Sequence, residues 1–218
     1  VEDNLYDKLS ARYTRALARS MSNTKQVKAS SVLNNAFDNT NYKGGDGVSL
    51  INSAHPTVGG GNWSNTLATP ADLNETSLEQ ALIDISLFID ERGLKIALRG
   101  MKLIAPPTLQ FTAERLMKST LRTATADNDI NAIKSMGLIP EGYAVNHYLT
   151  DTNAWFMLTD IPNGLKHFTR AALSTKMDND FSTGNSLYYL RAGAGTPQQL
   201  HVFDFGTKKD TALGPVGG

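Results

Sequence analysis

The stretch that decides the fold is residues 5–37, LYDKLSARYTRALARSMSNTKQVKASSVLNNAF. It lies within residues 1–43, which contain neither glycine nor proline, so nothing in it breaks a helix. Apolar side chains recur along it at helical spacing, at Leu5, Leu9, Tyr13, Leu17 and Met21. The spacing predicts one helix over 3–37, about 50 Å long at ~1.5 Å per residue. Because that length exceeds the diameter of a small domain, the helix must lie along a surface or reach a neighbouring molecule.

The charges on this predicted helix change sign near its start. Asp3 and Asp7 lie where the helix dipole favours anions, and every later charge as far as Phe37 is basic. These basic residues are Lys8, Arg12, Arg15, Arg19, Lys25 and Lys28. Two interpretations stay open: a solvated face on a core helix, and a spine that contacts other subunits.

The composition excludes several classes of protein. With 218 residues, the chain has room for one domain or two small ones. Its 21 Lys and Arg balance its 21 Asp and Glu, which argues against a dedicated nucleic-acid or membrane-surface module. The absence of cysteine excludes disulfides, cysteine-ligated zinc and thiol catalysis. No apolar stretch approaches the ~20 residues that span a bilayer.

Beyond residue 37, loops, helices and strands follow one another. Residues 38–71 are rich in Gly, Asn and Ser, with short apolar pieces such as 48–51, and predict a long loop with one short strand. Asp72 and Glu75 have capping-box spacing and predict a helix that Gly93 ends. Shorter helices are predicted at 108–119 and 127–137. The second of these is capped by Asp127, with Ile130, Ile133 and Met136 facing inward.

The strands cluster in the later part of the chain. They are predicted at 94–98, 101–105, 143–149, 154–158, 165–169 and 200–205. The turn residues at 162–164 predict that 154–158 and 165–169 form a hairpin. Helices that come first and strands that come late indicate an α+β fold.

No motif for a metal or cofactor is complete. The glycines near Asp46 lack the Lys-Ser or Lys-Thr of a phosphate-binding loop. Residues 127–138 begin like a calcium loop, but Ala132 and Leu138 replace its glycine and glutamate. The four histidines have no metal-ligand spacing, and we expect His147 and His167 to lie in strands as packing or surface residues; the four are His55, His147, His167 and His201.

The sequence offers residues for two catalytic arrangements. His55 with Asp46 and either Ser53 or Ser64 would form a hydrolase triad, although GxSxG is absent. Glu75 and Glu79 share a helix face and would pair as acid and base, but a solvated helix face is favoured. We therefore expect no catalytic residue, metal or cofactor, and a protein that works through shape and contact.

A series of short segments gives the chain its resemblance to a known family. They are SSVLNNAF (30–37), GGDG (44–47), LINSAHP (50–56), GGGNWSN (59–65), DL (72–73), DERGL (90–94), KLIAPP (102–107), AERL (113–116), TADND (125–129), YLTD (148–151), AWF (154–156) and PNGLK (162–166). In this order, over roughly residues 5–190, the chain resembles the major capsid (major head) proteins of tailed bacteriophages, specifically the Mu-like head subunit group.

The resemblance implies the tailed-phage capsid fold, with a long spine helix, a β-rich peripheral domain and a mixed α/β axial domain. Residues 1–72 would form the spine helix and Gly-rich loop of the peripheral domain. Residues 73–190 would form mainly the axial domain with late strands, and 191–218 a C-terminal segment without an assigned place. Family members carry an N-terminal arm and an extended loop before the spine helix, so the chain is expected to be a fragment or a processed form.

The resemblance also implies a function. Copies of the chain would assemble as hexamers and pentamers into an icosahedral shell around phage double-stranded DNA, in the host cytoplasm, and would remain in the virion. Portal, scaffold or decoration proteins would be further partners. No membrane partner and no catalytic site are implied.

Charge suggests how copies would meet. Residues 38–100 carry 4 basic and 8 acidic side chains, so they complement the basic helix and would pair head-to-tail between copies. The candidate subunit-facing or DNA-facing residues are Arg12, Arg15, Arg19, Lys25 and Lys28. Two alternatives stay open: an encapsulin-like cellular shell protein, and a hydrolase that uses the His55 loop.

Overall fold

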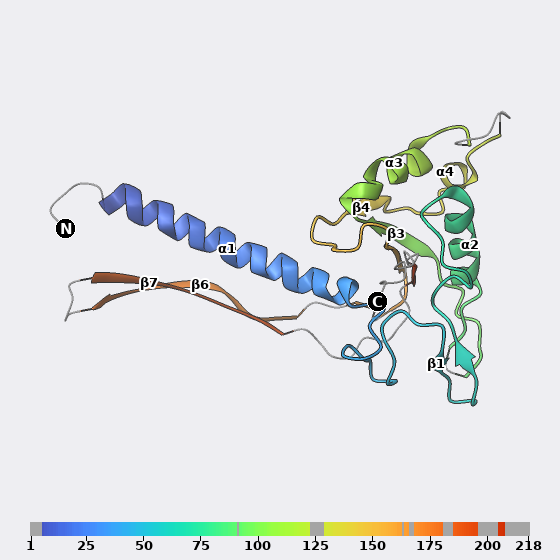
Figure 1. Ribbon diagram of the computed structural model, residues 1–218, viewed down its shortest axis with the longest axis horizontal. Helices are drawn as coiled ribbons and strands as arrows, with labels where there is room; N and C mark the ends of the chain where they lie inside the picture. The colour runs from blue at the N-terminus through green and yellow to red at the C-terminus, as the bar shows by residue number, and fades with distance from the viewer. Residues whose placement is uncertain are drawn as a thin grey trace, which may run out of the picture. The chain divides into compact units, whose positions relative to one another are not determined.

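The computed structural model describes residues 6–90, 92–122, 129–162, 164–165, 168–180, 185–195 and 205–207 (Figure 1). It contains helices and sheets, which confirms the α+β class. The chain divides into two compact units. The first combines Val1–Ser31 with Lys166–Pro197, and the second combines Val32–Leu165 with Gln198–Gly218.

Helix α1 dominates the first unit. It spans Tyr6–Asn34, which confirms the long helix predicted from the absence of Gly and Pro. It ends slightly before the predicted limit. The Ala36 N–H donates to the Leu33 carbonyl at 3.1 Å, so residues 35–37 form a turn instead of a further helical turn.

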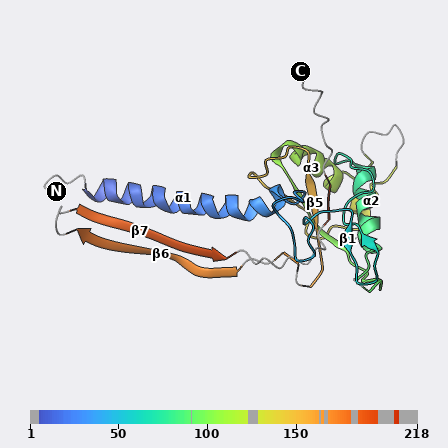
Figure 2. The same ribbon diagram turned by 60° about the horizontal axis from the view of Figure 1, so that its bottom comes forward.

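The rest of the first unit is a two-stranded antiparallel ribbon (Figure 2). β6 (Phe168–Asp180) pairs with β7 (Asn185–Gly195), with register shifts between Thr169 and Ser174. The predicted hairpin between 154–158 and 165–169 is therefore wrong, because the second strand belongs to this ribbon. The turn residues at 162–164 favour a local reversal of the chain, but which strands then pair depends on the whole sheet.

The second unit is built on a four-stranded sheet of order β4-β3-β5-β8. The strands are β3 (Gly100–Ala105), β4 (Tyr143–Val145), β5 (Trp155–Thr159) and β8 (Phe205–Thr207). β3 and β4 run parallel, and the other pairs are antiparallel. The predicted strands at 101–105 and 154–158 are confirmed. The one at 143–149 is shorter than predicted, and 200–204 lie outside the described residues.

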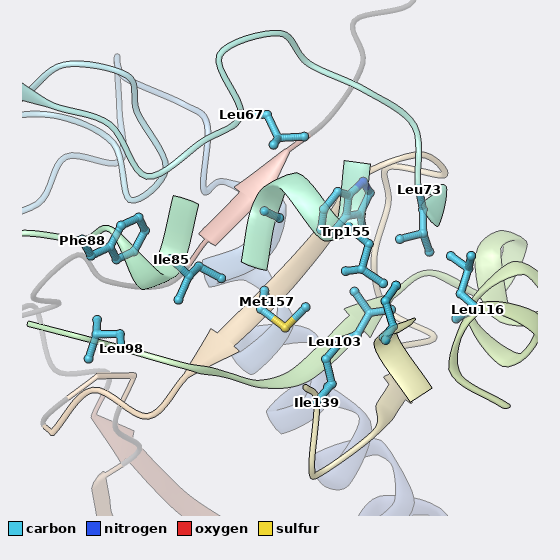
Figure 3. Close-up of a cluster of buried hydrophobic side chains, with 14 residues drawn as sticks. Leu67, Leu73, Ile85, Phe88, Leu98, Leu103, Leu116, Ile139, Trp155 and Met157 are labelled. Atoms are coloured by element: carbon cyan, nitrogen blue, oxygen red, sulfur yellow. The ribbon is translucent and has the colours of Figure 1, made fainter. Parts of the chain in front are cut away.

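Both faces of the sheet are covered, which explains the unbroken apolar run at 154–157. Trp155 and Met157 of β5 point into the main core, which includes side chains of α2, α3 and α4 (Figure 3). The intervening Phe156 packs into a second core with Leu33 and Ile51. Because successive strand residues face opposite sides, a strand buried on both faces needs apolar residues at every position.

Helix α2 (Glu75–Ser86) starts two residues later than predicted. Its N-cap is Asn74, whose Oδ1 accepts from the Ser77 N–H at 2.8 Å, while the Asn74 N–H donates to Ser77 Oγ at 3.0 Å. The predicted Asp72–Glu75 capping box is therefore wrong. The later start places Leu73 and Leu78 at the two positions of a hydrophobic staple, and both are buried in the main core.

The predicted end of that helix is also wrong. α2 ends at Ser86, and Gly93, with φ +86°, instead serves a tight turn in which Asp90 Oδ1 accepts from the Arg92 and Leu94 N–H groups at 2.8 Å. The predicted strand at 94–98 is reduced to one bridge between Ile89 and Lys95. Ala97 has a left-handed φ of 54°, which interrupts an extended strand.

Helix α3 (Gln110–Lys118), preceded by the 3-10 turn η1 (Pro107–Leu109), confirms the predicted helix. Helix α4 is only Ala132–Ser135, with Asn131 as its N-cap. Ile133 is buried as predicted, but Ile130 and Met136 are 72% and 70% exposed, because so short a helix has a single inward position. The predicted cap Asp127 lies outside the described residues.

The Gly-rich segment 38–71 is mostly loop, as predicted. Its two short strands are β1 (His55–Pro56) and β2 (Asn62–Trp63), which pair with each other. The apolar piece at 48–51 does not form a strand. Leu50 and Ile51 are buried by packing in the second core, and burial rather than strand pairing explains why they are apolar.

Candidate functional site

The five candidate basic residues divide into two groups on α1. Arg12, Arg15 and Arg19 follow i, i+3, i+7 spacing, so they share one face, and all three are exposed. Lys25 and Lys28 lie roughly on the opposite side, since a helix repeats every ~3.6 residues. Across the described part of the chain, none of the five forms an ion pair. We call Arg12, Arg15 and Arg19 the arginine face.

An apolar stripe runs along another side of α1. It consists of Tyr13, Leu17 and Met21, at four-residue spacing. Tyr13 is 70% exposed and Leu17 36%, and Val27 further along is 47% exposed. A solvated helix normally hides its apolar side against a core. Within the described residues this stripe has no such core, so it is a candidate contact surface.

The C-terminal end of α1 is tightly held. Asn34 Nδ2 donates to the Tyr148 carbonyl and Asn34 Oδ1 accepts from the Thr150 N–H, both at 3.0 Å. Beyond it, the Phe37 ring packs on Phe156 with centroids 5.9 Å apart. Both groups of the Asn34 amide are thus used to fix the last residue of α1 to residues 148–150, within the second unit.

The turn after α1 is closed by a carboxylate. Asp38 Oδ1 accepts from the Thr40 N–H at 2.8 Å and from the Asn41 N–H at 3.3 Å. These backbone hydrogen bonds, that from Thr40 first, lower the pKa of Asp38. The turn therefore supports the helix end at neutral pH, where this carboxylate is charged.

The hydrolase arrangement does not form around His55. The ring is 4% exposed, and its Nδ1 lies 2.6 Å from Asp46 Oδ2, as in a triad. Its Nε2, however, meets Asn65 Oδ1 at 3.2 Å instead of a serine hydroxyl. Ser64 Oγ donates to the Thr66 carbonyl, and Ser53 is exposed. Without a hydroxyl at Nε2, the histidine has no nucleophile to activate.

The expected solvated face at Glu75 is also wrong. Glu75 is 8% exposed, and its Oε2 pairs with Arg122 Nε at 3.3 Å. An acidic residue in the first turn of α2 is favoured by the helix dipole, and Arg122 supplies the opposite charge that a buried carboxylate needs. Glu79 takes no part in this pair, so the two glutamates do not form an acid–base couple.

Metal, membrane and ligand features are few. In the part of the chain that the structure describes, no group of three or more His, Asp and Glu residues is placed so that it could hold a metal ion. Among the same residues, no helix combines the length and apolarity required to cross a bilayer. His147 lies exposed in a turn, not in the predicted strand, and His167 and His201 lie outside the described residues. A shallow pocket of about 360 Å³ beside α2 is lined by none of the candidate residues.

A comparison with protein families decides the class of this chain. A family model described as phage capsid protein matches residues 1–199. The chain belongs to the phage capsid protein family. The capsid protein is therefore a structural component of the virion, in the bacteriophage head, and its family implies association with further copies into a shell. The family is structural and not enzymatic. Neither a curated protein nor a solved structure matches the chain.

The sequence predictions missed three residues of the capsid protein that hold segments of the described structure together. Asn34 ends α1, Asn65 is fully buried at the centre of the Gly-rich loop, and Arg122 neutralises Glu75. For Asn34 a signal was present, because asparagine is common at helix ends. For Asn65 and Arg122 no local signal exists, since their partners lie 10 to 47 positions away in the chain.

Proposed function

We propose that this capsid protein is the major head subunit of a tailed bacteriophage, in the Mu-like group, and that its copies assemble in the host cytoplasm into an icosahedral shell of hexamers and pentamers around packaged double-stranded DNA. The observation that carries the proposal is the exposure of α1. A helix of 29 residues presents an arginine face and an apolar stripe without a partner in the described chain. Both surfaces suit contacts outside the subunit.

The apolar stripe is assigned to a neighbouring subunit. Exposed aromatic and aliphatic groups gain most from burial, at about 25 cal/mol per Å² of apolar surface removed from water. Tyr13 and Leu17, the exposed members of the stripe, supply such surface. The ribbon β6–β7 supports the same idea, because an isolated two-stranded sheet is marginally stable in water. Among the described residues it has no third strand.

The arginine face is assigned to an anionic partner, either packaged DNA or an acidic surface of another copy. Guanidinium groups bind phosphate oxygens in a bidentate manner, and such contacts do not depend on base sequence. An acidic partner within 38–100 is weakened by internal pairing, because Asp46 is engaged by His55 and Glu75 by Arg122. This favours DNA, and Glu79 is the acidic residue through which the head-to-tail alternative is tested.

The domain layout is part of the proposal. Residues 1–72 would supply the spine helix and the Gly-rich loop of a peripheral domain, 73–190 mainly an axial domain, and 191–218 a C-terminal segment. The grouping of α1 with β6 and β7 in one unit supports a peripheral domain of spine helix and late strands. Portal, scaffold or decoration proteins are proposed as further partners in the head.

The experiment reverses the arginine face. The triple change Arg12→Glu, Arg15→Glu and Arg19→Glu should leave the subunit folded, because these side chains make no ion pair among the described residues. The matched control reverses the other side of the helix, Lys25→Glu with Lys28→Glu. Expressed protein is examined by circular dichroism, by electron microscopy and for nucleic-acid content.

Each outcome has a meaning. Loss of shells in the triple variant, with the control assembling, supports a subunit contact. Shells that form without DNA support a DNA contact. Normal, filled particles would refute the role of the arginine face, and the absence of any shells or sheets from wild-type protein would refute the shell. Wild-type particles that hold a protein cargo and no DNA would favour the alternative, an encapsulin-like cellular shell.

A further inference from the structure

Among the described residues, the ring nitrogens of the buried His55 meet two hydrogen-bond acceptors and no donor. Its Nδ1 lies 2.6 Å from the carboxylate oxygen Oδ2 of Asp46, and its Nε2 lies 3.2 Å from the amide oxygen Oδ1 of Asn65. A neutral imidazole carries one N–H, so it satisfies only one of them. An imidazolium, with two N–H groups, satisfies both.

The Asn65 amide cannot turn round to supply a donor. Its Nδ2 donates to the Leu50 carbonyl at 2.8 Å, and its Oδ1 also accepts from the Asn52 N–H at 2.8 Å. Exchanging the two amide atoms would put oxygen against oxygen at Leu50 and N–H against N–H at Asn52. Asn65 is also completely buried, so water does not replace these bonds. The orientation of the amide is therefore set by the backbone on both sides.

The surroundings favour a positive charge on the ring. Asp46 is the charged group in contact with His55 among the described residues, and it belongs to the turn 44–48. From β2, the ring of Trp63 lies 5.7 Å from the imidazole, within the ~6 Å over which an indole attracts a cation. Trp63 itself packs edge-on against Phe88 of the main core, with centroids 4.6 Å apart.

We propose that His55 holds both ring protons in the folded subunit, and that this imidazolium is a proton-dependent pin that closes the Gly-rich loop. The pin joins three segments that are separate in sequence: the turn at Asp46, strand β1 that carries His55, and the segment just after β2 that carries Asn65. Loss of one proton leaves either the carboxylate or the amide oxygen facing a lone pair. A ring with a single proton therefore leaves the loop with one of the two side-chain contacts of His55 broken.

The direct test is the protonation state of the ring in the full chain. Ring nitrogen and carbon-bound proton signals are followed by NMR from about pH 5 to about pH 9, a range that covers ordinary histidine titration. His147, exposed in a turn, is the internal reference, and His55→Gln identifies the signals of His55. In the wild-type chain at neutral pH we expect two protonated ring nitrogens at His55.

A matched variant separates charge from shape. Asp46→Asn keeps the size of the side chain but removes the negative charge, so His55 should carry one ring proton under the conditions in which the wild-type ring carries two. The thermal midpoint of wild type relative to His55→Gln should fall as the pH rises, because glutamine has no proton to lose there. A singly protonated His55 in folded wild type at neutral pH, or ring signals of Asp46→Asn that match those of wild type, would overturn the proposal. Neither readout depends on shell assembly.

Discussion

Helix α1 meets two different environments along its length. From Arg12 to Ala29 its residues are exposed or half-buried, including the apolar Tyr13 and Leu17. In its last turn and just after it, Leu33 and Ala36 are buried in the second core. The same uninterrupted helix therefore forms with and without a core beside it. Helical structure here follows from the local sequence, whereas stability comes from packing, so the exposed part is available for contacts with other molecules.

The largest expected effect lies in the packed region. Trp155 is fully buried on β5 and donates from Nε1 to the Ala71 carbonyl at 3.3 Å. Trp155→Ala should lower the free energy of unfolding of the unassembled subunit by about 3–5 kcal/mol, measured by urea denaturation. Tyr13→Ala on the exposed stripe should change it by less than about 0.5 kcal/mol. A large loss of unfolding free energy from Tyr13→Ala would show that the apolar stripe is already covered within one chain.

The next effect compares two asparagines of the same helix. Asn34→Ala removes both hydrogen bonds that fix the end of α1, to the Tyr148 carbonyl and the Thr150 N–H. It should cost about 1–3 kcal/mol of unfolding free energy. Asn23→Ala, at an exposed mid-helix position, should be neutral or slightly stabilising, since alanine favours helices. Equal losses for the two variants, by urea denaturation, would contradict the anchoring role of Asn34.

A smaller effect is expected where glycine is needed for space. A Cβ at Gly100 would lie 2.8 Å from Leu82 Cδ2 and 3.1 Å from Met157 Sδ. Gly100→Ala should cost about 1 kcal/mol, because the Leu82 side chain is able to move. Gly45→Ala is the control, since nothing lies within 4 Å of its Cβ position. If the thermal midpoint falls equally in both variants, the loss of stability is caused by backbone conformation and not by crowding at the new Cβ.

The smallest effect is a pH dependence in the second unit. The Tyr143 hydroxyl donates to Glu114 Oε2 at 2.7 Å, and Lys118 lies 3.0 Å from Oε1. The hydrogen bond from Tyr143 first, and then Lys118, lower the pKa of Glu114 below its ordinary value of 4.5. The stabilisation is therefore present above that value and is lost as the pH falls through the lowered pKa.

Removing the tyrosine hydroxyl tests this sign. Tyr143→Phe should flatten the decline of the thermal midpoint between about pH 6 and pH 3, because less stabilisation remains to be lost. Tyr148→Phe is the control, since its hydroxyl makes no hydrogen bond within the described residues. A steeper decline in Tyr143→Phe would reverse the assigned direction.

Sequence patterns succeeded where the cause is local. The absence of Gly and Pro predicted α1, and Pro106 and Pro107 predicted the end of β3. They failed where two local solutions compete. Asp72 and Asn74 both begin a capping pattern, and the burial of Leu73 selected the second. Arg12, Arg15 and Arg19 were each predicted as candidate contact residues. Only the continuous helix shows that they share one face and that Lys25 and Lys28 lie on another.

The sequence by itself determined the long helix, the strand at β5 and the absence of a complete catalytic motif, because each depends on residues close in the chain. Only the tertiary structure decided that β6 pairs with β7, that Glu75 is buried against Arg122, and that Nε2 of His55 faces Asn65. These are contacts between segments that are distant in sequence. Their formation depends on which surfaces pack together, and no local pattern records that choice.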